Sequence, residues 1–306
     1  MDIRFHGTES QGVRGLSCEV RLENRCVLID PGVALGFRRA GAPPHPVEVA
    51  AAEGTKKRLM DALQESTDVV ISHFHGDHMP LVQTDPYQFS AVQAMPLLAQ
   101  TNLWVKSTEG ESRNSRRRAR ELTSLLGHTL PIADGRDAGW LAFSHAVPHG
   151  EQRAKTTHVI MTKIQEAGSI FVHASDIQLL DDQAVEQILT FEPETVLVSG
   201  PPLYMGITSE QLDQAYERAV YLAQRVGTLI IDHHILRDWG GIEWFERLQR
   251  TAGENDVMCT ADYMNRPRRF LEAQRRELYK QYPVSNTWHT AYAQGEETTA
   301  DYRGLE

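Results

Sequence analysis

His73-Phe74-His75-Gly76-Asp77-His78 is the stretch that decides the fold, and it follows directly on a short apolar run. In an extended backbone, residues two apart point to the same side, so His73 and His75 can converge on one metal ion. Gly76 allows the chain to turn, which directs Asp77 and His78 toward a second ion beside the first. Imidazole nitrogen and carboxylate oxygen, without a thiolate, suit Zn²⁺ and also Fe or Mn. The stretch therefore predicts a metal site at the end of a buried strand.

Other His and Asp residues also follow apolar runs that are predicted strands. They are Asp30 after residues 25–29, Asp176 after residues 169–173, and His233 with His234 after residues 228–231. Strand ends in an α/β sheet meet at one rim, where loops leave space for a ligand, so we expect these side chains to gather there. Apolar periodicity also predicts helices over 47–64 and 209–226, the second beginning with a capping box of Thr208 and Gln211.

The six-residue stretch resembles the HxHxDH signature of the metallo-β-lactamase superfamily, and residues 28–32 resemble the earlier strand of that superfamily that ends in Asp. The resemblance spans roughly residues 15–240 and implies an α/β fold, a four-layer αβ/βα sandwich of two mixed sheets flanked by helices. A narrower likeness rests on residues 10–14, 43–46, 173–178 and 200–204. It is to a functionally uncharacterised group of prokaryotic members, so it implies a fold and a site but no substrate.

In that superfamily the remaining ligands are a lone His, a bridging Asp and a last His. For the first, His149 is preferred because it lies in a Pro-His-Gly loop, and His145 is the fallback. Asp176 is the candidate bridge, since its two oxygens can hold two cations, although it could instead cap a helix. For the last, His233 is favoured as ligand, and His234 is then a group that contacts substrate or orients a ligand.

Carried over residue by residue, the resemblance implies two divalent ions, with Zn²⁺ favoured and Mn²⁺ or Fe²⁺ also compatible. One ion would take His73, His75 and His149, the other Asp77, His78 and His233, with Asp176 between them. Asp30 would orient a ligand. Asp77 and His234 are the predicted catalytic residues: the ions would make hydroxide available near neutral pH, and His234 or a metal-bound water would protonate the leaving group.

Hydrolysis of a phosphoester or phosphodiester is the favoured function, because of the His and Asp ligand set and the arginine-rich segment from Arg113 to Arg120. That segment is either a solvated face or a patch that contacts phosphate or a partner. Hydrolysis of an ester, thioester or lactone at the same site is the alternative. A di-iron redox protein and a non-catalytic metal-binding protein are further possibilities.

Length alone permits one large domain or two small ones. Because no repeat or low-complexity linker divides the chain, one globular domain over residues 1–306 is favoured, with a core to about 283 and an acidic tail over 284–306. The net charge of -10 disfavours a nucleic-acid-coating role and leaves a small-molecule or phosphoester substrate. Without a signal peptide or membrane span, a cytoplasmic location is expected, and a homo-oligomer is left open. The three cysteines, Cys18, Cys26 and Cys259, indicate reduced thiols rather than disulfides.

Overall fold

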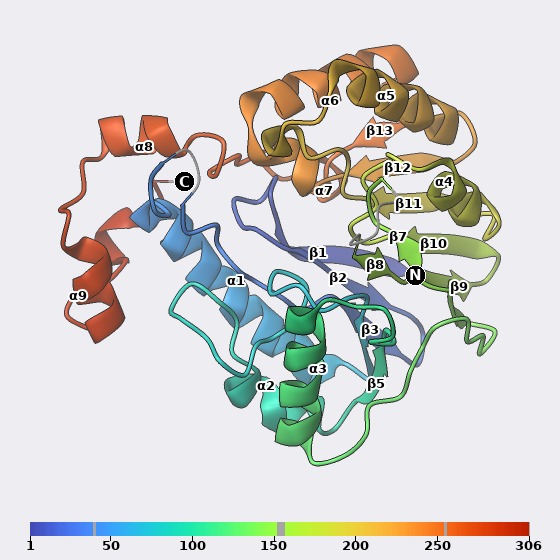
Figure 1. Cartoon of the computed structure of the whole chain (residues 1–306), viewed down its shortest axis with the longest axis horizontal. Helices are drawn as coiled ribbons and strands as arrows, with labels where there is room; N and C mark the ends of the chain where they lie inside the picture. Colours follow the sequence, from blue (N-terminus) through green and yellow to red (C-terminus); the bar gives the residue numbers. More distant parts are fainter. Residues whose placement is uncertain (39–40, 152–156, 254–255, 306) are drawn as a thin grey trace.

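Two mixed β-sheets pack face to face in the computed structural model, which describes residues 1–38, 41–151, 157–253 and 256–305 (Figure 1). The first sheet has the order β1-β2-β3-β4-β5, with bounds Asp2–Thr8, Leu16–Arg21, Cys26–Ile29, Asp68–Ile71 and Asn102–Val105. Strands β1 to β3 are antiparallel neighbours, whereas β3, β4 and β5 are parallel. The predicted strand over residues 25–29 is present as β3, and β4 is the predicted buried strand before residues 73–78, which are called the metal-binding stretch below.

The second sheet has the order β13-β12-β11-β10-β9-β6. In chain order its strands are β6 (Leu141–Phe143), β9 (Thr162–Glu166), β10 (Ser169–His173), β11 (Thr195–Val198), β12 (Thr228–Ile231) and β13 (Val257–Met258). Strands β10 to β13 are parallel, and β9 and β6 complete the sheet in antiparallel pairing. Strands β7 (Val147–Pro148) and β8 (His158–Val159) form a separate antiparallel pair beside it.

Helices cover the outer face of each sheet, as Figure 1 shows. Helices α1 (Pro46–Glu65), α2 (Ala91–Leu98) and α3 (Arg113–Leu126) pack on the first sheet, and α4 (Asp182–Leu189), α5 (Ser209–Ala223) and α6 (Trp239–Ala252) pack on the second. The alternation of strand side chains explains the layers. In β4, Val69 and Ile71 join the core under the helices, while Val70 joins the core between the sheets. The expected four-layer αβ/βα sandwich is therefore confirmed.

Both predicted long helices begin with a capping box. At α5, Thr208 and Gln211 exchange side-chain and backbone contacts, as the sequence indicates. At α1, His45 is the N-cap: its Nδ1 accepts a hydrogen bond from Val47 N, and Glu48 bonds back to the His45 backbone. His45 therefore has a structural role, because these contacts satisfy backbone N–H groups that the first helical turn leaves without partners.

The arginine-rich segment lies in helix α3, which begins at Arg113 with Ser112 as its N-cap. The C-terminal region, which includes most of the predicted acidic tail, packs on the first half of the chain. Helices α8 (Arg275–Gln281) and α9 (Trp288–Gln294) lie beside α1 (Figure 1), and Trp288 is buried in the core under α1. Thr299 Oγ1 donates to Glu53 of α1. Aromatic packing and this contact hold residues that the sequence analysis assigned to a weakly patterned tail.

Short helices complete the chain: η1 (Leu203–Met205), η2 (His234–Arg237), α7 (Thr260–Tyr263) and η3 (Ala300–Tyr302). The three cysteines are free and buried, as expected for reduced thiols. Within the described ranges, no helix combines the length and the apolarity that a membrane span needs.

Candidate metal centre

The metal-binding stretch occupies the loop that leaves the end of β4, and the loop after β3 packs tightly against it. Asp30 has a positive φ of 49° and ends β3, and Gly32 lies against the backbone of the stretch. A Cβ atom added to Gly32 would lie 2.4 Å from the backbone nitrogen atoms of both His78 and Met79. Only glycine fits there, so the Asp-Pro-Gly sequence is a packing requirement of the site.

The carboxylate of Asp176, which follows β10, lies at the centre of the site. Five histidines face it from the loops after β4 and β12. Its Oδ2 is 3.4 Å from His73 Nε2, 3.8 Å from His75 Nδ1 and 3.3 Å from His234 Nε2, and its Oδ1 is 3.1 Å from His78 Nε2 and 3.4 Å from His233 Nε2. The Oδ2 atom therefore faces three of these histidines, and the Oδ1 atom faces the other two. Asp176 is not a helix cap, since Asp181 caps α4.

The Asp30 carboxylate orients the side chains of the site through hydrogen bonds to neighbouring loops. Its Oδ2 is 2.9 Å from His78 Nδ1, which leaves Nε2 of that ring directed at Asp176. Ser72 donates from both its backbone N–H and its hydroxyl, and the Ser175 hydroxyl donates as well. The carboxylate thus ties together the loops after β3, β4 and β10, in the orienting position predicted for it.

The arrangement fits a divalent ion. Tetrahedral ligands at normal zinc distances stand about 3.3 Å from one another. The observed separations among Asp176, His73, His78, His233 and His234 match this value, including 3.3 Å between His78 Nε2 and His233 Nε2. Buried His73 Nε2, His234 Nε2 and both Asp176 oxygens have no hydrogen-bond partner among the described residues. Such buried atoms are costly unless an ion or ordered solvent satisfies them.

The histidine positions differ in how closely they approach this centre. His149 lies to one side: its ring centroid is 6.4 Å from that of His73 and 5.9 Å from that of His75. Among the described residues, several clusters of His and Asp have potential ligand atoms within 4.8 Å of one another, and His149 belongs to none of these clusters. The Gln178 amide lies 2.8 Å from its Nδ1 and fixes the ring. His145 is exposed and packs against Gly135, so the structure does not bring the fallback residue to the centre.

Burial and neighbouring charges set the protonation of the site. Burial, together with the charges of His78 and His75, lowers the pKa of His73 to about 4, and burial lowers the pKa of His149 to about 3. Neutral imidazole is the form that binds metal. Burial opposes protonation of His78, but Asp176 and Asp30 outweigh it and raise its pKa well above the ordinary value. Metal binding at His78 would therefore release a proton.

Sequence reasoning missed the residues that surround the centre. Arg237, in η2, is buried and donates from Nη2 to Asp77 Oδ2 at 3.2 Å, and the same atom lies 2.6 Å from His233 Nε2. Its Nε donates to Glu9 Oε1 at 2.7 Å and its Nη1 to the Tyr204 hydroxyl at 2.7 Å. The signal was available in the sequence, since an arginine four residues after His233 returns to the same side of a helical turn.

The arginine-rich helix α3 contributes one residue to the site. Half-buried Arg118 donates from Nη1 to the carbonyl of Phe74 at 2.9 Å, so a cation adjoins the metal-binding stretch. Its neighbour Arg117 pairs with Glu121 within the helix, and both Arg116 and Arg120 are exposed. The segment is thus mainly a solvated face with a single member directed at the loop.

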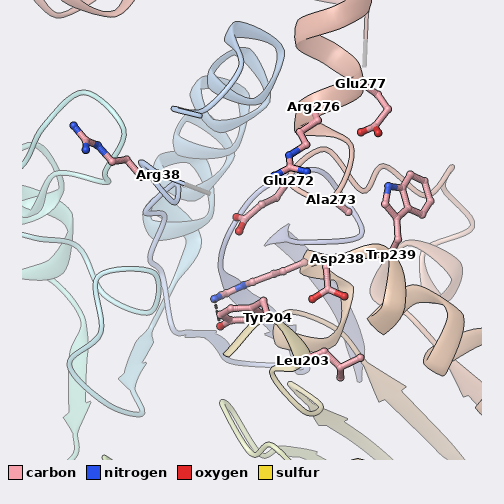
Figure 2. A pocket seen from close by; sticks show the side chains of 10 residues that line it. Arg38, Leu203, Tyr204, Asp238, Trp239, Glu272, Ala273, Arg276 and Glu277 are labelled. Carbon is pink, nitrogen blue, oxygen red and sulfur yellow. Dashed lines mark hydrogen bonds between the residues drawn. The ribbon is translucent and has the colours of Figure 1, made fainter. Parts of the chain in front are cut away.

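A pocket of about 660 Å³ adjoins the centre and is shown in Figure 2. Tyr204 and Arg237 line this pocket, and the Tyr204 hydroxyl accepts a hydrogen bond from Arg237 Nη1. Trp239 and Leu203 supply apolar surface, while charged side chains from α8 lie across from them. A smaller pocket of about 290 Å³ opens beside His149.

Comparisons with solved structures return matches at low sequence identity. The chain aligns with a mutant of the CmlA β-hydroxylase over 84% of this chain and 52% of that chain, at 14% identity and a TM-score of 0.47. It aligns with the mono-zinc form of the metallo-β-lactamase FIM-1 from Pseudomonas aeruginosa over 80% and 85%, at 15% identity and a TM-score of 0.30. No protein-family model matches the chain.

Curated relatives give a much stronger match. A UPF0282 protein of Methanosarcina mazei is 46% identical over 303 residues, which cover 99% of both chains. A UPF0282 protein of Thermococcus kodakarensis is 34% identical over 89% of this chain and 93% of its own, and one of Methanopyrus kandleri is 33% identical over 89% and 97%. With 46% identity over nearly its whole length to a member of that family, this chain, with its four-layer αβ/βα sandwich and its His and Asp cluster, belongs to the UPF0282 family.

Proposed function

We propose that this protein is a metal-dependent hydrolase that cleaves a phosphoester or phosphodiester. The observation that carries the proposal is the Asp176 carboxylate, both of whose oxygens are buried, face imidazoles and have no hydrogen-bond partner among the described residues. A divalent ion bound there lowers the pKa of water and polarises the substrate oxygen. His73, His75 and Asp176 would hold such an ion, with His149 beside them.

The surrounding hydrogen bonds suit His234 to the role of proton donor. Arginine can only donate, so the Tyr204 hydroxyl accepts from Arg237 and has its own proton left for His234 Nδ1, which is 2.6 Å away. His234 Nδ1 is then an acceptor, and its Nε2 carries the ring proton toward Asp176. The leaving oxygen of a substrate can take that proton from His234 Nε2. The Tyr204 hydroxyl can then supply a new proton to the His234 ring at Nδ1.

Two cations support a phosphoester over a neutral acyl substrate. Arg237 touches Asp77 and His233 on one side of the centre, and Arg118 touches the Phe74 carbonyl on another. Fixed cations beside a reacting phosphoryl group stabilise the negative charge on its oxygens in the transition state. An acyl substrate develops charge on a single oxygen and has less need of positive charge on two sides.

The proposal is tested by assaying protein loaded with Zn²⁺ or Mn²⁺ against bis(p-nitrophenyl) phosphate and p-nitrophenyl phosphate, with lactone and thioester panels in parallel. We expect phosphoester cleavage that disappears in His73→Ala. His145→Ala is the matched control, because this exposed histidine packs against Gly135, and its activity should equal that of the wild type. Turnover of lactones or thioesters alone would move the assignment to acyl hydrolysis, and turnover of neither class would contradict it.

A further inference from the structure

The second metal position of the superfamily pattern already contains a positive charge in this protein. The atoms that define that position are Asp77 Oδ2, His78 Nε2, His233 Nε2 and Asp176 Oδ1, with 3.5 Å between the Asp77 and His233 atoms. The guanidinium of Arg237 contacts two of them through Nη2, at 3.2 Å from Asp77 Oδ2 and 2.6 Å from His233 Nε2.

Arg237 is fixed in this place by three further groups. Its side chain is 4% exposed. Glu9 Oε1 accepts from its Nε at 2.7 Å, and the Tyr204 hydroxyl accepts from its Nη1 at 2.7 Å. Glu9 itself is 2% exposed, in the turn that follows β1. Each nitrogen of the guanidinium therefore has a protein acceptor, and the cation is part of the folded structure rather than a mobile surface group.

The chemistry of guanidinium conflicts with a second ion at this position. Arginine stays protonated and has only donors, so its contact with His233 Nε2 uses the lone pair that a metal would need. Its contact with Asp77 likewise neutralises the carboxylate that would attract the ion. Two cations sharing these buried ligands would also repel each other in a poorly screened interior. The first position is different, because His73 Nε2 and Asp176 Oδ2 have no hydrogen-bond partner among the described residues.

We infer that Arg237 takes the place of the second metal ion, so that the centre binds one divalent ion tightly at His73, His75 and Asp176. Asp77 and His233 then serve as acceptors for the guanidinium, which supplies the second positive charge, and His78 lies beside them with its Nε2 3.3 Å from His233 Nε2. The inference differs from the expectation of two divalent ions, since it assigns one. The use of that charge in hydrolysis rests on the proposed function, whereas the number of ions does not.

The experiment counts metal ions on the full-length protein. Chelator-stripped protein is titrated with Mn²⁺ by calorimetry, and retained metal is measured after desalting. We expect one tightly bound ion in the wild type and a second ion bound at least about 100-fold more weakly. Arg237→Met should retain two ions. Arg25→Met is the matched control, because Arg25 pairs with buried Asp68 at the opposite end of β4, and it should retain one.

Electron paramagnetic resonance of the Mn²⁺-loaded wild type gives a second reading that does not depend on any variant folding. An isolated-ion spectrum with excess Mn²⁺ supports the inference, and the spectrum of a coupled pair overturns it. Two ions of similar affinity in the wild type, or one ion in folded Arg237→Met, would also overturn it. None of these measurements needs turnover, so a failure of the phosphoester assay leaves the count of ions interpretable.

Discussion

Replacing Asp30 by Asn tests whether this carboxylate organises the metal centre. The substitution keeps the size of the side chain but removes the negative charge beside His78 Nδ1. Burial alone would raise the pKa of Asp30, but the hydrogen bond and the charge of His78 outweigh it, and the pKa falls from 3.8 to about 2. At about 1.4 kcal/mol per pKa unit, the charged form contributes about 2 kcal/mol to folding near neutral pH.

The sign of the pH dependence follows from the lowered pKa. The contribution of Asp30 is complete above its unfolded pKa of 3.8 and is lost as the pH falls toward about 2. Urea unfolding at pH 7 should therefore show Asp30→Asn to be less stable than the wild type by about 2 kcal/mol. The difference should become smaller as the pH falls below 4. Loss of the group that orients a ligand should also weaken metal binding about 10- to 100-fold, measured by competition with a chelating dye.

Asp68→Asn is the control that separates metal binding from stability. Asp68 is as buried as Asp30 and accepts hydrogen bonds from Thr67 and Trp104, but it lies at the opposite end of β4. Its replacement should lower stability and leave metal affinity unchanged. Equal metal affinities of Asp30→Asn and the wild type, or equal losses in the two variants, would refute the orienting role of Asp30.

Four further substitutions test the scaffold by urea or thermal unfolding. Gly32→Ala should cost about 3 kcal/mol and reduce metal retention, because its Cβ would overlap the backbone at His78; wild-type behaviour would contradict the close packing. Gly54→Ala should instead stabilise by about 0.5–1 kcal/mol, since this helical position is open, and any loss would count against that. Arg275→Met should cost about 3–5 kcal/mol by leaving Glu48 buried without its partner, so a cost under 1 kcal/mol is the contrary result. His45→Ala should lower stability by about 1 kcal/mol through loss of the N-cap of α1. An unchanged melting temperature would contradict the capping role of His45.

Local pattern was sufficient for most of the secondary structure. The apolar runs that form β3, β4, β10 and β12 are short, β-branched and bounded by turn residues, so the ends of these strands could be predicted. The capping box at Thr208 likewise identified the start of α5, since its two partners are three residues apart. The packing of the C-terminal residues could not be predicted, because Trp288 contacts the core under α1, which is remote in sequence.

The amino-acid sequence by itself determined the HxHxDH stretch and the place of Asp30, because each depends on spacing within a few residues or on one strand end. The sandwich was predicted from the resemblance of these residues to a known superfamily. Only the tertiary structure decided how the distant loops share Asp176: His233 and His234 face different oxygens of one carboxylate, while His149 lies to the side. It also brought Arg237, which Glu9 and Tyr204 hold in place, against Asp77. The contact between Glu9 and Arg237 joins residues 228 apart in the sequence, and its distance depends on the packing of two sheets, which no local pattern records.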